Sequence, residues 1–272
     1  MPPKLVALDL DGTLLKADGA IDPRDVAAVG RALRLGVAIT LATGRLATGA
    51  LPCARALGLV APLVCADGGL LACATTGATL EVTALAPAVV VRALATFEEH
   101  GVAPFLFFGG EIHAAPSSGA VHALLRSYTP HIIEHDCSAL SCHRAADQVV
   151  LAVGVGARGR AESARRALEA SAPCVEVATY VLSGETWAVR VRPAACDKAR
   201  LLARLARRLG AGPADVCALG DWYNDVSMLS WAGRALAMAD APGEVRAAAR
   251  GVVRARRGEG GAVAEAMARW LS

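Results

Sequence analysis

The chain has 272 residues, enough for about two domains, and 54% of them are hydrophobic. Its longest stretch without an acidic residue, Lys or Arg, 112–125, has only 14 residues, whereas a membrane-spanning helix needs about 20, so we expect no membrane partner. A formal net charge of +3 is too small to indicate a nucleic-acid or lipid-surface partner. Asp9 and Asp11 interrupt the apolar start, and we therefore expect no signal peptide.

The first part of the chain alternates between apolar runs and helical patterns. The run at 4–11 lacks a period of two, which is typical of a strand covered on both faces in a parallel sheet. In chain order, the next expected elements are a helix from Pro23 to a stop at Gly36, a strand at 36–43, a helix at 47–57 and a strand at 62–66. This order predicts an α/β fold with a doubly wound parallel sheet.

The pattern changes between residues 82 and 192, where apolar runs become shorter and Gly and Ser more frequent. Helical patterns alternate there with strand-like runs: helices at 87–100 and 160–171, and strands at 104–108, 148–153, 174–178 and 186–192. We expect an inserted α+β domain with a mainly antiparallel sheet.

After residue 192 the alternation of the first part returns. The expected elements are a helix at 196–209, a strand at 215–221, a helix ending near 231, a strand at 234–238, a helix at 243–249, a strand at 252–253 and a helix ending near 271. Residues 1–81 and 193–272 are therefore expected to form one discontinuous core domain, interrupted by a domain of residues 82–192.

The eight cysteines are spread singly through apolar segments. In a long chain without an export signal, this usage is typical of reduced, mostly buried thiols in the cytoplasm. His135, Cys137, Cys142 and His143 could also be grouped as a zinc site, because His and Cys are its usual ligands. Their spacing matches no familiar zinc motif, so we expect these residues to belong to the surface and core of the inserted domain.

Polar residues follow the expected strands at their carboxyl ends, where ligands bind in open α/β sheets. They are Asp9, Asp11, Thr43, Asp67, Asp221, Asn224 and Asp225, and Lys198 at the start of its helix can reach the same crevice. Several carboxylates beside one hydroxyl and one ammonium favour a hard divalent cation such as Mg²⁺, which keeps positions for water and substrate phosphate. The sequence therefore predicts a phosphoryl-binding site.

Four motifs resemble those of the haloacid dehalogenase superfamily of phosphohydrolases: Asp9-Leu-Asp-Gly-Thr13, Thr43-Gly-Arg45, Lys198 and Gly220-Asp-Trp-Tyr-Asn-Asp225. Only 34 positions separate Asp9 from Thr43, whereas 155 separate Thr43 from Lys198. This layout is similar to the Cof-type branch (class IIB), which carries an α/β cap between the second and third motifs. The segment Glu259-Gly-Gly-Ala-Val263 is also similar to the C-terminal signature of that branch. The resemblance implies a Rossmann-like core with an inserted α+β cap.

The resemblance also implies roles for the site residues. Asp9 would be the nucleophile that forms an aspartyl-phosphate, and Asp11 would protonate the leaving oxygen and then deprotonate the attacking water. Asp9, the backbone carbonyl of Asp11 and Asp221 would hold Mg²⁺, with Asp225 in a second layer. The phosphate- and substrate-binding residues would be Leu10, Thr43, Gly44, Arg45, Lys198 and Asn224.

The expected activity is Mg²⁺-dependent hydrolysis of a small phosphorylated metabolite by a monomer or homodimer. Sugar phosphates are the first substrate class expected, ahead of flavin mononucleotide or pyridoxal phosphate. Two alternatives stay open: a phosphotransferase similar to phosphomannomutase, and a non-catalytic phospho-ligand-binding protein. Asp67 departs from the family, which more often has Asn in this turn, so the sequence leaves its role open.

Overall fold

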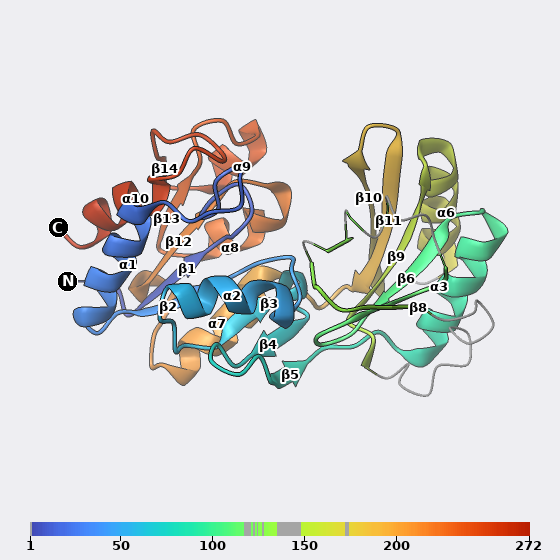
Figure 1. Ribbon diagram of the computed structural model, residues 1–272, viewed down its shortest axis with the longest axis horizontal. Coiled ribbons are helices and arrows are strands. Elements are labelled where there is room, and N and C mark those ends of the chain that lie inside the picture. Colours follow the sequence, from blue (N-terminus) through green and yellow to red (C-terminus); the bar gives the residue numbers. More distant parts are fainter. Residues whose placement is uncertain are drawn as a thin grey trace. The chain divides into compact units, whose positions relative to one another are not determined.

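The computed structural model describes residues 2–116, 121, 123, 125, 126, 128–134, 148–171 and 174–272 (Figure 1). The chain divides into two compact units. The first comprises Met1–Gly44, Ala50–Leu80 and Asp197–Ser272, and the second comprises Arg45–Gly49 and Glu81–Cys196. The assignment of a core domain to residues 1–81 and 193–272, and of a cap domain to 82–192, stays a prediction. The grouping differs from it most at Arg45–Gly49.

The first unit is built on a five-stranded parallel sheet in the order β14-β13-β12-β1-β2. Its strands are β1 (Leu5–Leu8), β2 (Ala38–Leu41), β12 (Val216–Gly220), β13 (Arg234–Ala237) and β14 (Gly251–Val252). All residues of β1 and β12 are buried, as expected for apolar runs without a period of two. The doubly wound parallel sheet predicted from the sequence is confirmed.

Helices connect these strands. They are α1 (Pro23–Arg34), α2 (Ala47–Ala56), α7 (Lys198–Arg208), α8 (Val226–Trp231), α9 (Gly243–Ala248) and α10 (Ala262–Trp270). Helix α1 packs against α10, and α7 packs against α8. Among the described residues, we find no helix that combines the length and the apolar character needed to cross a membrane.

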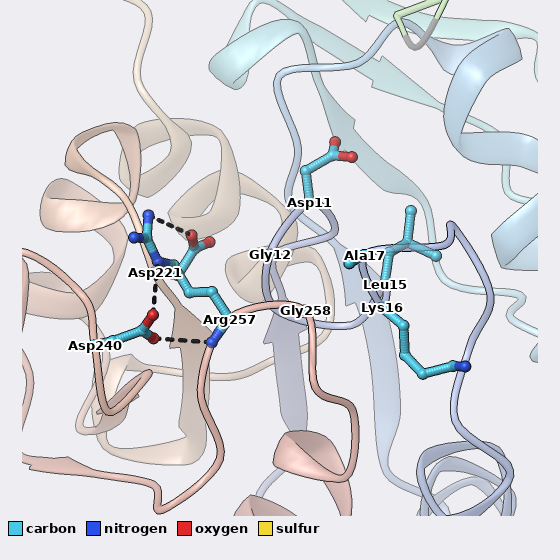
Figure 2. A pocket seen from close by; sticks show the side chains of 9 residues that line it. All are labelled: Asp11, Gly12, Leu15, Lys16, Ala17, Asp221, Asp240, Arg257 and Gly258. Carbon is cyan, nitrogen blue, oxygen red and sulfur yellow. Dashed lines mark hydrogen bonds and ion pairs between the residues drawn. The ribbon is translucent and has the colours of Figure 1, made fainter.

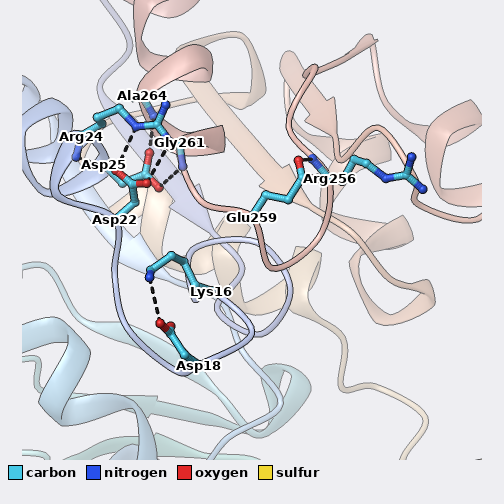
Figure 3. A network of polar contacts seen from close by, with 9 residues as sticks. All are labelled: Lys16, Asp18, Asp22, Arg24, Asp25, Arg256, Glu259, Gly261 and Ala264. Atoms are coloured by element: carbon cyan, nitrogen blue, oxygen red, sulfur yellow. Dashed lines mark hydrogen bonds and ion pairs between the residues drawn. The ribbon is translucent and has the colours of Figure 1, made fainter.

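Helix α1 also supplies the cap of α10. The carboxylate of Asp25 is buried and accepts hydrogen bonds from the backbone N–H groups of Gly261, at 2.9 Å, and Ala264, at 2.7 Å (Figure 3). The first N–H groups of a helix have no partner within the helix, so a side-chain acceptor at this end stabilises it. Asp25 therefore fixes the C-terminal helix to the N-terminal helix.

A three-stranded sheet of β3 (Leu63–Cys65), β4 (Leu70–Ala72) and β5 (Thr79–Val82) adjoins β2. The backbone N–H of Thr43 donates to the carbonyl of Val64 at 2.9 Å, which places β3 directly beside the end of β2. The sequence predicts β3 but neither β4 nor β5. A tight turn, Ala66–Gly68, connects β3 to β4.

The second unit contains a six-stranded sheet in the order β10-β11-β9-β6-β7-β8, antiparallel except for the β7–β8 pair. The strands are β6 (Ala103–Phe107), β7 (Ile112–Ala114), β8 (Ile132–Glu134), β9 (Leu151–Ala157), β10 (Val175–Ser183) and β11 (Thr186–Pro193). Helices α3 (Pro87–Glu99) and α6 (Arg158–Ser171) lie on one face of this sheet (Figure 1). Phe97, Leu106, Leu168 and Val189 belong to the apolar core between them.

Six of the cysteines lie in the described part of the chain, and all six are free thiols. Cys65, Cys196 and Cys217 are buried, whereas Cys53 and Cys73 are partly exposed and Cys174 is exposed, so fewer of the described thiols are buried than the sequence predicts. The group His135, Cys137, Cys142 and His143, considered above as a zinc site, lies outside the described residues.

Candidate active site

The residues that follow the parallel strands meet at the carboxyl edge of the first sheet. Asp9 follows β1 and Asp221 follows β12, its direct neighbour in the sheet. The backbone N–H of Asp9 donates to the carbonyl of Leu219 at 2.9 Å, which continues the ladder up to the site. Asp9 and Asp221 are only 5% and 4% exposed. Two buried carboxylates therefore lie side by side because their strands are paired.

Lys198 places a buried ammonium between the carboxylates. It is the first residue of α7, whose N-cap Asp197 accepts from the backbone N–H of Arg200. Its Nζ lies 2.7 Å from Asp9 Oδ1 and 2.6 Å from Asp225 Oδ1, and its side chain is fully buried. Burial alone would lower the pKa of Lys198, but the charges of Asp225 and Asp9 outweigh it and raise the pKa. Lys198 is therefore a permanent cation.

Asp9, Asp221 and Asp225 form a buried acidic cluster, with one carboxylate oxygen of each within 4.8 Å of the others. Burial, and then the charge of Asp225, raise the pKa of Asp9 above its ordinary value. The same two causes raise the pKa of Asp221 to about 6. When all three carboxylates are ionised, they exceed the single ammonium of Lys198 by two negative charges. This donor set of carboxylate oxygens and its charge fit a hard divalent cation such as Mg²⁺.

The carboxylate of Asp221 is held in a fixed orientation. Thr13 Oγ1 donates to Asp221 Oδ1 at 2.9 Å. Gly12 has a φ of +85°, and a Cβ added there would lie 2.6 Å from Asp221 Oδ2. The first motif therefore needs glycine at this position for two reasons, the left-handed backbone and the close approach of the carboxylate. The sequence shows Gly12 and Thr13 within a motif but does not reveal that they act on Asp221.

Asp225 is held by the backbone around it. Its Oδ2 accepts from the N–H groups of Asp221, at 2.9 Å, and Trp222, at 3.1 Å, while its Oδ1 accepts from Lys198. A Cβ at Gly220 would lie 2.6 Å from the Asp225 carboxyl carbon. The last residue of the fourth motif thus contacts the backbone of its first residues, and Asp225 orients both Asp221 and Lys198.

A pocket opens beside this cluster, and Asp11, Asp221 and Arg257 are among the residues that line it (Figure 2). Asp11 is exposed, unlike Asp9. Arg257 Nη1 lies 4.0 Å from Asp221 Oδ2, and its Nε lies 3.5 Å from Asp240 Oδ2. The guanidinium carbon is 4.9 Å from the ring centroid of Trp222. No motif in the sequence indicates that Arg257 approaches the site.

The structure brings most of the remaining predicted residues to the same edge. Asn224 Nδ2 donates to Asp67 Oδ1 at 2.8 Å, and a Cβ at Gly44 would lie 3.2 Å from the same oxygen. The side chain of Thr43 is buried. Leu10 is buried too, and its carbonyl accepts from the N–H groups of Leu14 and Leu15. Arg45 belongs to the second unit, where its Nη1 lies 3.5 Å from the carbonyl of Gly49.

A family model of haloacid dehalogenase-like hydrolases matches residues 6–267, nearly the whole chain. The chain belongs to this family. The resemblance seen in the four motifs is thereby confirmed, and with it the assignment of this haloacid dehalogenase-like protein to the hydrolases.

Three proteins are similar to this hydrolase over different shares of its length. The phosphoglycolate phosphatase of Pyrobaculum neutrophilum is 36% identical over 124 residues, which are 42% of this chain and about half (54%) of that protein. The pyridoxal phosphate phosphatase of Escherichia coli is 27% identical over 265 residues, 93% of this chain and 94% of that protein. The crystal structure of a haloacid dehalogenase-like hydrolase from Bacteroides thetaiotaomicron is 25% identical, with a TM-score of 0.83 over 98% of this chain and 99% of that one.

Proposed function

We propose that the protein is a Mg²⁺-dependent phosphatase that hydrolyses a small phosphorylated metabolite, with sugar phosphates as the first class to test. The observation that carries the proposal is the buried contact of Lys198 with both Asp9 and Asp225, beside Asp221. A protein that only binds phosphate has no use for three buried carboxylates, which repel an anion. Membership of the hydrolase family and the two relatives named as phosphatases support the same reaction.

In the proposed reaction, a carboxylate oxygen of Asp9 attacks phosphorus and forms an aspartyl-phosphate, while the bond from phosphorus to the ester oxygen breaks. Asp11 gives its proton to that leaving oxygen. A water molecule then attacks the phosphorus, Asp11 takes up its proton, and the bond to Asp9 breaks to release phosphate. The exposed position of Asp11 beside the buried Asp9 suits a group that exchanges protons with leaving group and water.

Asp9, Asp221 and the backbone carbonyl of Asp11 would hold Mg²⁺, and Asp225 would support them from behind. When bound, the cation supplies positive charge that offsets the charge of the phosphoryl oxygens. Lys198 contributes a second, permanent positive charge beside the nucleophile. The fixed orientation of Asp221 by Thr13 and Gly12 keeps the donor oxygens in place before the cation arrives.

The phosphoryl oxygens would be bound by the Thr43 hydroxyl, the N–H of Gly44, the ammonium of Lys198 and the amide of Asn224, with Leu10 contributing its backbone. The small size of Gly44 lets the chain run close to the site. These donors bind most strongly where charge develops in the transition state. Arg45 is proposed to contact the substrate.

Activity can be tested with p-nitrophenyl phosphate and a panel of sugar, nucleotide and cofactor phosphates, with Mg²⁺ or with EDTA. We expect turnover with Mg²⁺ only, and none in Asp9→Asn, which keeps the size of the side chain and should remain folded. Turnover that persists in Asp9→Asn, or in EDTA, would contradict the nucleophile or the cation. The phosphotransferase alternative predicts an isomerised hexose phosphate, whereas the phosphatase releases inorganic phosphate.

We also infer a cytoplasmic location, which the free thiols support because reducing compartments keep cysteines in this form. Size-exclusion chromatography with light scattering would distinguish the monomer from the homodimer. The proposed partner is the phosphorylated metabolite.

A further inference from the structure

The turn between β3 and β4 has an unusual backbone. Ala66, Asp67 and Gly68 have φ values of +50°, +52° and +96°, so three successive residues are left-handed. Asp tolerates this conformation better than most residues, and glycine adopts it freely. A Cβ at Gly68 would lie 2.2 Å from the carbonyl oxygen of Asp197, so the turn packs directly against the start of α7. The surrounding structure therefore holds a strained turn next to Lys198.

This turn brings the carboxylate of Asp67 to the second and fourth motifs, whose residues are proposed to bind the phosphoryl oxygens. Asp67 is only 4% exposed. Its backbone N–H donates to the carbonyl of Thr43 at 3.1 Å, and its Oδ1 accepts from Asn224 Nδ2 at 2.8 Å. The same oxygen lies 3.2 Å from where a Cβ of Gly44 would be. Asp67 therefore contacts both the second and the fourth motif, although it belongs to neither.

The contact decides which way the side-chain amide of Asn224 faces. A primary amide has an oxygen end that only accepts and a nitrogen end that carries two N–H groups. An ionised carboxylate only accepts, so it can bond to the nitrogen end alone and repels the oxygen end. With one N–H donated to Asp67, the nitrogen end of the Asn224 amide is held in place, and its second N–H is the group that would donate to a phosphoryl oxygen.

We propose that Asp67 is a positioning residue, which fixes the amide of Asn224 with its nitrogen toward the phosphoryl group. The proposal rests on the proposed function of the same pocket. The charge of Asp67 also raises the pKa of Lys198, so the part of its effect that passes through Asn224 is measured between variants that both lack this charge.

The left-handed backbone allows a sharp choice of variants. Asp67→Gly removes the carboxylate and keeps the conformation, because glycine is relaxed at a φ of +52°. Asp67→Asn keeps an acceptor oxygen of the same shape and also tolerates this conformation. Asn224→Ala removes the amide itself. The double variant Asp67→Gly with Asn224→Ala completes a cycle that measures the coupling of the two side chains.

Inorganic phosphate is the probe, titrated calorimetrically into each variant in the presence of Mg²⁺. A hydrogen bond to a charged group corresponds to roughly a tenfold change in affinity, so we expect Asn224→Ala to bind phosphate about tenfold more weakly than the parent protein. Asp67→Gly should bind phosphate about tenfold more weakly than Asp67→Asn, which lacks the repelling negative charge as well. The double variant should be no weaker than Asn224→Ala alone. The KM for p-nitrophenyl phosphate should rise in parallel.

Two results would overturn the inference: equal phosphate affinity in Asp67→Gly and Asp67→Asn, or independent losses that multiply in the double variant. Melting temperatures identify a variant that has lost its fold, and Asp67→Asn then provides the comparison. A parent protein that binds phosphate but hydrolyses no ester would refute the phosphatase proposal, while the binding cycle would still test Asp67.

Discussion

Lys198 Nζ lies 2.7 Å from Asp9 Oδ1, although the two residues are 189 positions apart in the chain. The contact forms because β1 delivers Asp9 and the start of α7 delivers Lys198 to the same edge of one sheet. Both side chains are out of water, so neither charge is stabilised by solvent and each depends on the other.

Replacing Lys198 by Met should therefore destabilise the protein strongly in the absence of a metal. The substitution keeps most of the length of the side chain but leaves Asp9 and Asp225 facing each other without a counter-charge, which costs about 3–5 kcal/mol. Urea unfolding in EDTA would measure it, and Mg²⁺ should restore part of the loss. The control variant Lys16→Met, at a partly exposed lysine whose ammonium pairs with Asp18, should cost less than about 1 kcal/mol. Equal effects of the two variants would contradict the buried pairing.

The raised pKa of Asp221 predicts a pH dependence of metal-free stability. The folded protein keeps a proton on Asp221 up to about pH 6, whereas the unfolded chain loses it near the ordinary value of 3.8. The folded state binds more protons between these values, so the contribution of Asp221 to the free energy of unfolding falls as the pH rises through this window. Denaturation in EDTA from pH 4 to pH 7 would show it. The slope should be smaller in Asp221→Asn, and an identical slope would rule out this source.

Arg257 should weaken the binding of Mg²⁺. Its guanidinium lies 4.0 Å from Asp221 Oδ2 and therefore repels a cation on the same carboxylate. Because the side chain is 35% exposed, solvent screens the effect, and Arg257→Gln should tighten Mg²⁺ binding by about threefold. Calorimetric titration would measure the change, with Arg256→Gln as a control that removes the same charge one position away. The fluorescence of Trp222, on which the guanidinium stacks, should also change in Arg257→Gln. Weaker Mg²⁺ binding in this variant would instead make Arg257 a support of the ligand.

Asp25→Ala should destabilise the first unit through α10. The substitution leaves the partly buried N–H groups of Gly261 and Ala264 without their acceptor, at a cost of about 2 kcal/mol. Asp25→Asn keeps one acceptor oxygen, so its free energy of unfolding should lie between those of Asp25→Ala and the parent protein. Chemical denaturation would measure both, with the exposed Asp18→Ala as the reference. A loss in Asp25→Ala no larger than in Asp18→Ala would show that the cap contributes little.

The sequence predicts the parts of this protein that depend on local pattern. The apolar runs that end at Asp9 and Asp221 identify buried parallel strands, and the carboxylates after them predict the site. The short strands β4, β5, β7 and β8 escape prediction because three or four residues are too few to show a period, and β5 is largely exposed.

Contacts between distant segments cannot be predicted from the sequence, for another reason. Asn224 and Asp67 are 157 positions apart, and nothing in either motif indicates that one amide faces the other carboxylate. Arg257 reaches Asp221 from a loop whose path depends on Asp240. The carboxylate of Asp240 accepts from the backbone N–H of Arg257 at 2.8 Å. The assignment of Arg45–Gly49 to the second unit likewise depends on packing that no local pattern records.

The strand order also determines which unit can fold first during synthesis. β1 is made first, but its neighbour β12 is complete only at Gly220, so the nascent first unit lacks one side of its sheet until most of the chain has left the ribosome. The last residue of the second unit, Cys196, is translated before that point. Because domains fold as units during translation, the second unit can reach its native state before the C-terminal half of the first unit has been synthesised.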